Sequence, residues 1–493
     1  MQNKNKLSVL FVGAELAPLV KVGGLGDVMG ALPKSLVKQG VNVSMIIPFY
    51  GVIDAKKFKT KLVKKNIKFN IDGQPAKFDL YQTFLPGTKI IIFLVKHKLF
   101  INKDIYVGGR RYMKGRVYSR SIGDIERFVF FSKAVAETIR SMKWKIDVVH
   151  AHDWHTALLP TFIDEYSLED KNFSNIKTLF TIHNLANQGI SSLDIVDYGG
   201  LHHDLTPALM EDYYDKDGDK IDMMKIGILS ADLINTVSPS YAKEILTKEY
   251  GEKLETYLLR RKKHLFGIVN GIDLDLFNPN KDKFIYKKYN AKNRKINKQF
   301  NKQALQAEMK LPKEDVPVLG LVSRLVNQKG LDILVPALDK LLAKQDVQVI
   351  ILGTGQPEHE QAFKKLAKKY PTKLSANITF NIAMAQKIYA GSDFFLMPSA
   401  FEPCGLGQMM AMRYGTLPLV RATGGLKDTV KHSITGIVFK KYTQTAMRKA
   451  LEQAIRLYKN KVKFNKMVST AMRQDFSWDQ SAKEYIKLYK KLI

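Results

Sequence analysis

With 493 residues the chain is too long for one ordinary hydrophobic core, so two domains are expected. Apolar residues make up 45% and charged residues 25%, as in globular proteins, and no apolar stretch is long enough to cross a membrane. The formal net charge is +31, but basic residues are dispersed without a nucleic-acid motif, which predicts a lysine-rich surface and no specific nucleic-acid partner.

The single cysteine, Cys404, excludes an intrachain disulfide and favours a reducing cytoplasm. Residues Leu7–Ala14 follow two lysines and mimic a short signal sequence. Glu15 interrupts the apolar region, and cleavage nearby would remove a strand that the following glycine turn needs. We therefore expect this segment to be the first strand of the fold, and we expect no membrane attachment.

Both halves of the chain alternate apolar runs with helical patterns. In the first half the expected strands are 7–13, 41–47, 146–151, 178–182 and 233–237, with a helical pattern over 26–39. The segment 262–270 is the predicted crossing point, and a lysine-rich region extends to Asn301. The second half continues with expected strands 316–323, 347–353, 377–380, 393–398 and 417–420, and with helices 359–369, 407–414 and 479–492. This alternation predicts two α/β domains with doubly wound parallel sheets.

Polar turns follow many of these strands. In open parallel sheets ligands bind beyond the carboxyl ends of the strands. We therefore expect one cleft to be ringed by the turns after Gly13, Ala151, Ile182, Val322, Gly353 and Pro398.

The first turn contains Lys21, Gly23 and Gly24. Glycines allow a tight turn, and the following helix offers unpaired N–H groups and a mobile lysine charge to a phosphate. In the second half, Arg324 follows a strand and Lys329 lies near a helix start, where the two cations suit a diphosphate. Taken alone, these features also fit a structural glycine turn and a solvated basic turn.

A set of histidines and an aspartate lies at the ends of two further expected strands of the first half, 146–151 and 178–182. His150, His152, Asp153 and His155 crowd one strand end, and His183 follows another. Zinc is a weak hypothesis because the spacing lacks the H-E-x-x-H form and no cysteine is near. Hydrogen bonding of sugar hydroxyls by Asp153 and His183 fits better, although some histidines are equally consistent with core positions.

Phe401–Gly407 forms a further turn after an apolar run. Pro403 and Gly405 are expected to bend the chain so that Glu402 points into the cleft, with backbone N–H groups behind it. The alternative is a plain strand–turn–helix junction with an exposed glutamate. Cys404 has no partner histidine motif, so we expect a packing residue near the ligand and not a nucleophile.

Together these segments resemble the bacterial glycogen synthase and plant starch synthase family of GT-B glucosyltransferases. The resemblance extends over nearly the whole chain and is carried, in order, by KVGGLGDV (21–28), HAHDWHTAL (150–158), TIHNLANQG (181–189), GIVNGID (267–273), SRLVNQKG (323–330), FEPCGLGQ (401–408) and YGTLPLVRATGGLKDTV (414–430).

The resemblance implies two Rossmann-like domains facing a central cleft: 1–262 for the acceptor, 263–472 for the nucleotide sugar, and a helix over 473–493 that packs back on the first domain. It implies retaining transfer of glucose from ADP-glucose to the non-reducing end of an α-1,4-glucan, with no metal or cofactor. The implied catalytic residues are Glu402, His183, Arg324 and Lys329. The implied substrate-binding residues are Lys21, Gly23, Gly24, Asp27, Asp153, Asn270, Phe380, Cys404, Gly405 and Leu406.

Several positions differ from the family pattern. Val22 replaces the commoner threonine, Asn187 stands where tyrosine is usual, and Gly407 where threonine is usual. The stretch 380–383 lacks an acidic residue that the family often shows, which leaves Phe380 as the expected stacking partner of the base.

Two other functions remain possible at this stage. One is a related GT-B transferase with another donor or acceptor; the other is a glucan-binding protein without turnover. A glycosidase is disfavoured because no convincing pair of carboxylates accompanies the cationic residues.

Overall fold

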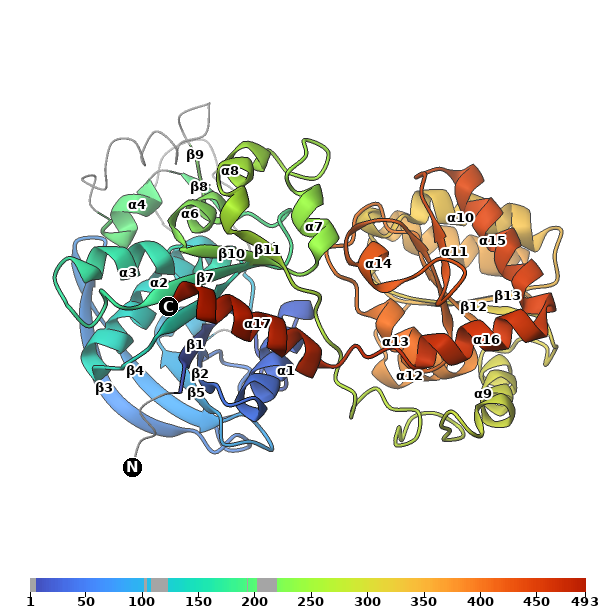
Figure 1. Cartoon of the computed structure of the whole chain (residues 1–493), viewed down its shortest axis with the longest axis horizontal. Helices are drawn as coiled ribbons and strands as arrows, with labels where there is room; N and C mark the ends of the chain where they lie inside the picture. The colour runs from blue at the N-terminus through green and yellow to red at the C-terminus, as the bar shows by residue number, and fades with distance from the viewer. Residues whose placement is uncertain (1–5, 102–103, 108–122, 193, 202–219) are drawn as a thin grey trace. The chain divides into compact units, whose positions relative to one another are not determined.

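The computed structural model describes residues 6–101, 104–107, 123–192, 194–201 and 220–493. By its contacts the chain forms two units (Figure 1). Unit 1 comprises Met1–Val237, Ala242–Ile268 and Trp478–Ile493, and unit 2 comprises Ser238–Tyr241 and Val269–Ser477. The chain thus passes into unit 2 after Ile268, where the sequence predicted residue 262, and returns to unit 1 at Trp478, where the sequence predicted residue 473.

Unit 1 contains a nine-stranded sheet in the order β11-β10-β7-β6-β1-β2-β5-β4-β3. The seven strands from β11 to β5 are parallel, as the alternating pattern predicts. The strand bounds are β1 Ser8–Val12, β2 Asn42–Pro48, β3 Lys61–Ile71, β4 Gln74–Phe84, β5 Ile91–Lys96, β6 Val148–His152, β7 Lys177–Ile182, β10 Leu233–Thr236 and β11 Leu265–Gly267; a separate antiparallel pair is β8 Ile190–Ser192 and β9 Lys220–Asp222.

Two antiparallel strands, β3 and β4, extend this sheet beyond the predicted parallel part. The residues between them, Asp72 and Gly73, both have positive φ angles, of 55° and 66°. An Asp-Gly pair between two strands is typical of a two-residue hairpin turn. The sequence therefore contained the signal for this hairpin, but the strands expected from the alternating pattern did not include β3 and β4.

The helices of unit 1 lie on both faces of the sheet. The connections β1–α1–β2 and β6–α3–β7 run in opposite directions along the strand order, so right-handed crossovers place α1 and α3 on opposite faces. The helices are α1 Gly24–Lys38, α2 Asp124–Met142, α3 Leu159–Ser167, α4 Asp194–Gly199, α6 Met223–Ser230, α8 Glu255–Arg260 and α17 Trp478–Leu492, with short 3-10 turns η1 Lys98–Phe100, η2 Trp154–Thr156 and η3 Lys262–His264. A further helix, α7 Pro239–Glu244, begins in the short segment Ser238–Tyr241 of unit 2 and ends in unit 1.

Unit 2 contains a six-stranded parallel sheet in the order β14-β13-β12-β15-β16-β17. Its strands are β12 Val318–Val322, β13 Gln348–Leu352, β14 Leu374–Asn377, β15 Phe394–Met397, β16 Leu417–Arg421 and β17 Ile437–Phe439. Its helices are α9 Arg294–Glu308, α10 Leu331–Leu342, α11 Pro357–Lys369, α12 Ile382–Gly391, α13 Gly407–Arg413, α14 Gly424–Thr429, α15 Gln444–Lys459 and α16 Lys461–Met472, with η4 Asn327–Lys329. The predicted strand over 377–380 is wrong: β14 ends at Asn377, and Phe380 lies in the following loop.

The sequence suggested that the lysine-rich stretch 281–302 is a solvated surface, and this is only partly correct. On α9 the ammonium groups of Lys298 and Lys302 are buried. Lys298 Nζ donates to Thr416 Oγ1 at 2.7 Å, and Lys302 Nζ lies 2.8 Å from Asp393 Oδ2. Two lysines of this dense stretch therefore serve the packing of α9 within unit 2, and burial lowers the pKa of Lys298 to about 7.

Each sheet reverses its strand order once. In unit 1 the reversal lies between β1 and β6, and in unit 2 between β12 and β15. Crossovers leave in opposite directions from such a pair of strands, so a crevice opens at their carboxyl ends. Glu15 and Asp153 follow the strands of the first pair, and Arg324 and Glu402 follow those of the second.

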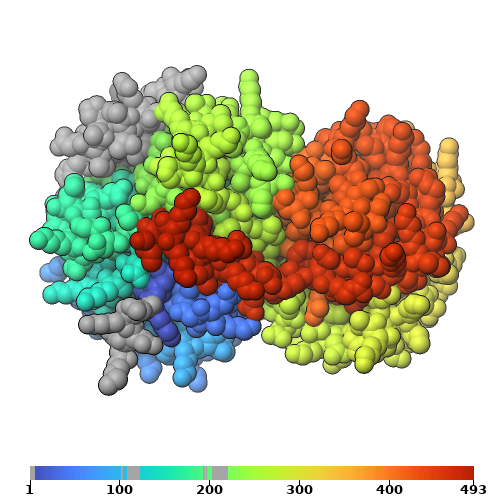
Figure 2. All heavy atoms as spheres, in the orientation of Figure 1, coloured from blue at the N-terminus to red at the C-terminus, as the bar shows by residue number. Residues whose placement is uncertain are grey.

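The last helix, α17, packs on unit 1 as predicted, beside α1. In Figure 2 its dark red atoms lie next to blue and green atoms of unit 1. Its buried Tyr489 hydroxyl lies 2.8 Å from Nδ1 of His150, whose Nε2 lies 2.7 Å from Thr181 Oγ1. The C-terminal helix therefore completes the hydrogen bonding of a buried strand residue two positions before His152. Among the described residues, no helix combines the length and the apolar character that a membrane crossing requires.

Tyr489→Phe should lower the free energy of unfolding by about 1–3 kcal/mol, because His150 loses a partner in a site that water does not reach. The measurement is chemical denaturation of the variant beside Tyr81→Phe, a half-buried tyrosine whose hydroxyl bonds to none of the described residues. The control should change stability by less than about 0.5 kcal/mol. Equal stabilities of the two variants would show that the His150 bond contributes nothing.

Candidate functional site

In unit 2, Lys329 and Glu402 meet beyond the carboxyl ends of β12 and β15. Lys329 Nζ lies 2.7 Å from Glu402 Oε2, and both side chains are largely buried. The hydroxyl of Ser399 donates to the same oxygen at 2.9 Å. Two residues that the sequence predicted for one site are thus in direct contact across 73 residues of chain.

The segments that carry these two residues are bonded to each other. The N–H of Ala400 donates to Gln328 O at 2.9 Å, and Gln328 Nε2 donates to Phe401 O at 3.2 Å. Gly330 has a φ angle of 68°, and a Cβ there would lie 2.1 Å from Pro398 O. Only glycine allows this close approach, which fixes Lys329 beside the segment leading to Glu402.

The turn from Phe401 to Gly407, here called the Glu402 turn, is packed against the first residues of α14. Gly425 N–H donates to Glu402 O at 3.1 Å, and Cβ atoms at Gly424 and Gly425 would lie 2.0 and 2.2 Å from the carbonyl oxygens of Glu402 and Cys404. Gly405 has a φ angle of 70°, as its place in the turn requires. Gln408 Nε2 donates to Gly405 O at 2.9 Å. The predicted bend is therefore present, and the carboxylate of Glu402 is buried beside Lys329.

Arg324 follows β12 directly, as predicted. The next residue, Leu325, donates its N–H to Thr354 O at 2.8 Å and so fixes the backbone after the strand. The guanidinium itself is exposed, and it forms no hydrogen bond or ion pair with the residues that the structure describes. Arg324 thus presents an uncompensated positive charge at the same sheet edge as Lys329.

Cys404 and Asn270 also meet in unit 2. The backbone N–H of Asn270 donates to the Cys404 sulfur, and burial raises the pKa of the thiol to about 12. A thiol with this pKa is not a nucleophile near neutral pH, in agreement with a packing residue. The Asn270 Oδ1 atom is buried and unpartnered within the described part of the chain.

Phe380 stands apart from these contacts. Its side chain is 84% exposed, between β14 and the N-cap of α12, where Asn381 accepts a hydrogen bond from Met384 N–H. The ring packs against no core cluster of unit 2. The exposed ring is open to stacking by a ligand.

In unit 1, Glu15 occupies the glycine turn, which the sequence analysis missed. Glu15 Oε2 accepts from the N–H groups of Val22 and Gly23 at 2.7 and 2.8 Å, and Oε1 accepts from the Tyr106 hydroxyl at 2.8 Å. The N–H of Gly23, which the family resemblance assigns to the donor, is bonded to Glu15 in this structure. Backbone N–H groups at the start of a helix attract negative charge, and the Glu15 carboxylate accepts their hydrogen bonds when no anionic ligand is bound. The sequence signal for this role was Glu15 itself, an acidic residue in an otherwise apolar stretch.

Lys21 is likewise not the free charge that the sequence suggested. Lys21 Nζ lies 2.7 Å from Asp27 Oδ1, at the start of α1, and the lysine remains half exposed. Because exposed ion pairs are weak, a phosphate group can replace Asp27 as the partner of this lysine. Gly24 is the first residue of α1.

Asp153 and His183 are joined at the carboxyl ends of β6 and β7. Asp153 Oδ1 accepts from the backbone N–H of His183 at 2.7 Å. Asp153 has φ and ψ angles of 56° and 178°, a combination that non-glycine residues rarely adopt and that is often found at functional sites. Burial raises the pKa of the Asp153 carboxyl to about 7, and the N–H bonds from His183 and Asn184 only partly oppose this.

Three imidazoles form a row behind Asp153, in which His150 and His152 are fully buried and His183 is half-buried. Nδ1 of His152 and Nε2 of His183 lie 3.0 Å apart, so one of them donates and the other accepts. Burial lowers the pKa of His183 to about 3 and those of His150 and His152 well below the ordinary value. The row is therefore neutral at pH 7 and suits hydrogen bonding to uncharged groups. Where the structure describes the chain, no three His, Cys, Asp or Glu side chains are grouped to hold a metal ion.

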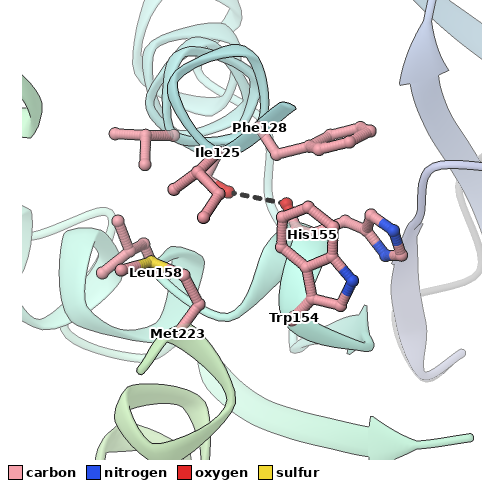
Figure 3. A pocket seen from close by; sticks show the side chains of 8 residues that line it. Ile125, Phe128, Trp154, His155, Leu158 and Met223 are labelled. Atoms are coloured by element: carbon pink, nitrogen blue, oxygen red, sulfur yellow. Dashed lines mark hydrogen bonds between the residues drawn. The ribbon is translucent and has the colours of Figure 1, made fainter. Parts of the chain in front are cut away.

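A narrow apolar space lies beside η2 in unit 1 (Figure 3). Ser132 Oγ donates to His155 O at 3.4 Å at its edge, and a Cβ at Gly189 would lie 2.4 Å from the Trp154 ring. No residue predicted to bind or react with a ligand lines it; its lining is Ile125, Phe128, Val129, Ser132, Trp154, His155, Leu158 and Met223. The space belongs to the packing that fixes the turn after β6.

Comparison with protein families agrees with this geometry. A family described as the starch synthase catalytic domain matches residues 8–260, and glycosyl transferases group 1 matches residues 302–469. The chain is 43% identical to a glycogen synthase of Fervidobacterium nodosum over 98% of this chain and 99% of the relative. It is 44% identical to a glycogen synthase of Thermosipho africanus over 99% of both chains.

Solved structures show the same fold. The catalytic domain of starch synthase IV from Arabidopsis thaliana, bound to ADP and acarbose, matches with a TM-score of 0.86 and 32% identity over 99% of both chains. A sucrose-phosphate synthase from Thermosynechococcus elongatus matches with a TM-score of 0.58 and 17% identity, which shows the fold alone. The chain is a glycosyltransferase with the GT-B fold and belongs to the glycogen synthase and starch synthase family.

Proposed function

We propose that this enzyme transfers glucose from ADP-glucose to the non-reducing end of an α-1,4-glucan, with retention of the anomeric configuration. The observation that carries the proposal is the contact between Lys329 and Glu402, at the sheet edge where Arg324 also follows β12. The starch synthase match supports the choice of substrates, because that structure is bound to ADP and acarbose. ADP is the leaving group of the proposed donor, and acarbose is an oligosaccharide analogue.

The cations of unit 2 suit the departure of a diphosphate. As the glucosyl bond breaks, the anomeric carbon gains positive charge and the leaving phosphate gains negative charge. Arg324 is unpaired among the described residues, and Lys329 is held in place by Glu402. We assign both cations to the diphosphate. Glu402 then fixes Lys329 and lies beside the transferred glucose.

The other polar groups of the predicted site suit the sugar. We assign His183, Asp153 and Asn270 to hydrogen bonds with glucose hydroxyls, because His183 is uncharged and Asn270 Oδ1 has no partner among the described atoms. Phe380 is assigned to the base, since its ring is exposed. The remaining assignments to the donor follow the family resemblance: Lys21, Gly23, Gly24, Asp27, Cys404, Gly405 and Leu406.

We propose no metal or cofactor, because Lys21, Arg324 and Lys329 together supply the positive charge that phosphate departure needs. We also propose that the enzyme works in a reducing cytoplasm, because the only cysteine in its sequence, Cys404, is a buried free thiol.

A related transfer from another nucleotide sugar is the second candidate. This second candidate is favoured by the loop at Phe380, because residues 381–383 contain no acidic side chain that could bind the ribose of the donor. The deciding experiment supplies glycogen with ADP-glucose or UDP-glucose and follows nucleotide release and glucan growth. Growth with ADP-glucose supports the proposal; release without growth indicates another acceptor. No release by folded protein with either donor would favour a different donor or a glucan-binding role.

Arg324→Ala and Lys329→Ala should each lower kcat roughly a hundredfold, because each removes about 3 kcal/mol of stabilisation from the departing diphosphate. The control is Lys344→Ala, a lysine beyond α10 that the proposal gives no role. Circular dichroism establishes that the variants are folded before steady-state kinetics with ADP-glucose. Near-wild-type turnover in Arg324→Ala or Lys329→Ala would remove that residue from the reaction.

Protonation of Asp153 should limit activity on the acid side. Since burial raises the pKa of this carboxyl to about 7, the charged form is lost as pH falls through 7. If ionised Asp153 binds glucose, kcat/KM should fall about tenfold for each pH unit below that value.

The measurement is kcat/KM for ADP-glucose from about pH 5.5 to 8.5 in wild type and in Asp153→Asn. The variant should be less active and should lack the acid limb near pH 7. An identical limb in both proteins would assign that limb to another group.

A further inference from the structure

Residues Ser238–Tyr241 belong to unit 2, although the chain on both sides of them belongs to unit 1. The segment follows β10 by one residue and includes the start of α7. It comes from the first half of the sequence, about 160 residues before the Glu402 turn. This placement raises the question of what the segment does in unit 2.

Ser238 is bonded to the Glu402 turn. Its side chain is fully buried, and Oγ donates to Pro403 O at 2.6 Å, while Tyr241 N–H donates to Oγ at 3.2 Å. Pro403 O also accepts from Gly425 N–H at 3.2 Å. The hydroxyl is therefore saturated by two main-chain groups, and one of them belongs to the residue directly after Glu402.

Ser240 is bonded to the helix on the other side of the turn. Its N–H and Oγ donate to the two carboxylate oxygens of Asp428, at 2.8 and 2.6 Å. Asp428 lies on α14, whose Gly424 and Gly425 pack on the carbonyl groups of the Glu402 turn. The segment, the turn and α14 thus form a closed ring of three contacts within unit 2.

The geometry points to a function for this ring. The direction of the Pro403 carbonyl sets the plane of the peptide group between Pro403 and Cys404. The proline ring also fixes the φ angle of Pro403. The direction of that peptide determines where Gly405, at a φ angle of 70°, turns the chain. The same backbone carries the Glu402 carboxylate on one side and the N–H groups of Gly405 and Leu406 on the other.

We propose that Ser238 is a positioning residue for the transfer reaction: its hydroxyl holds the Pro403 carbonyl and thereby the orientation of the Glu402 turn. Ser240 supports it through Asp428 and α14. The inference rests on the proposed function, because it assigns to the turn a role in catalysis. Loss of the Ser238 hydroxyl leaves the Lys329–Glu402 pair without direct change but loosens the backbone that carries it.

The test compares Ser238→Ala with a matched control, Thr138→Val. Thr138 is also fully buried and donates its hydroxyl to a main-chain carbonyl, Ala134 O, at 2.7 Å, but it lies on α2 of unit 1 and away from any proposed ligand residue. Both variants lose one buried hydrogen bond to a carbonyl, and Ser238→Ala also loses the bond from Tyr241 N–H, so thermal stability should fall in both variants and further in Ser238→Ala.

Only Ser238→Ala should change the chemistry. We expect kcat to fall about tenfold while the KM for ADP-glucose changes less than about twofold, because a small misplacement of reacting groups affects the transition state more than ground-state binding. Thr138→Val should keep wild-type kcat per folded molecule. Ser238→Thr retains the hydroxyl and should recover most of the activity.

Equal kcat in Ser238→Ala and Thr138→Val would overturn the proposal. If Ser238→Ala does not fold, Ser240→Ala removes the side-chain bond to Asp428 and leaves the main-chain bond; it should lower kcat by a smaller factor, and unchanged kcat there overturns the proposal as well. Failure of the proposed function is distinguishable, because wild-type protein would then form no glucan from ADP-glucose.

Discussion

The reversal of strand order in each parallel sheet is the constraint on which both halves of the candidate site depend. Right-handed crossovers leave the two central strands in opposite directions, so a crevice opens at their carboxyl ends. In unit 1 this edge carries Glu15 and Asp153, and in unit 2 it carries Arg324 and Glu402. Residues that are far apart in sequence reach the same edge because each follows a strand of the same sheet.

Opposite charges already meet at these edges without a ligand. Lys329 lies against Glu402, Lys21 against Asp27, and the amide hydrogens of the glycine turn against Glu15. Charges held in this way avoid the cost of an unpaired group in a partly buried site. Under the proposed function, the diphosphate of the donor competes with the protein's own carboxylates for these cations, which favours a ligand of higher negative charge. Arg324, exposed and unpaired among the described residues, is the group ready to attract it.

Many residues that hold the site are not themselves the candidate ligand contacts. Gly330, Gly424 and Gly425 allow backbone segments to approach so closely that a Cβ atom would collide with a carbonyl oxygen. Ser399 and Ser238 bond to the carboxylate of Glu402 and to the carbonyl after it. The turn is therefore defined by contacts from three segments of chain, and its geometry depends on their packing.

The sequence by itself determined the two α/β units, the strands that precede the polar turns, and most candidate residues. Local patterns were sufficient there, because apolar strands, glycine turns and helix starts are set by neighbouring residues. Only the tertiary structure showed that Glu15 fills the glycine turn, that Lys298 and Lys302 are buried, that Phe380 lies beyond its strand, and that Ser238 bonds to Pro403. Each of these facts depends on a contact or exposure created by distant parts of the chain, and a local pattern carries no information about which distant group will be its partner.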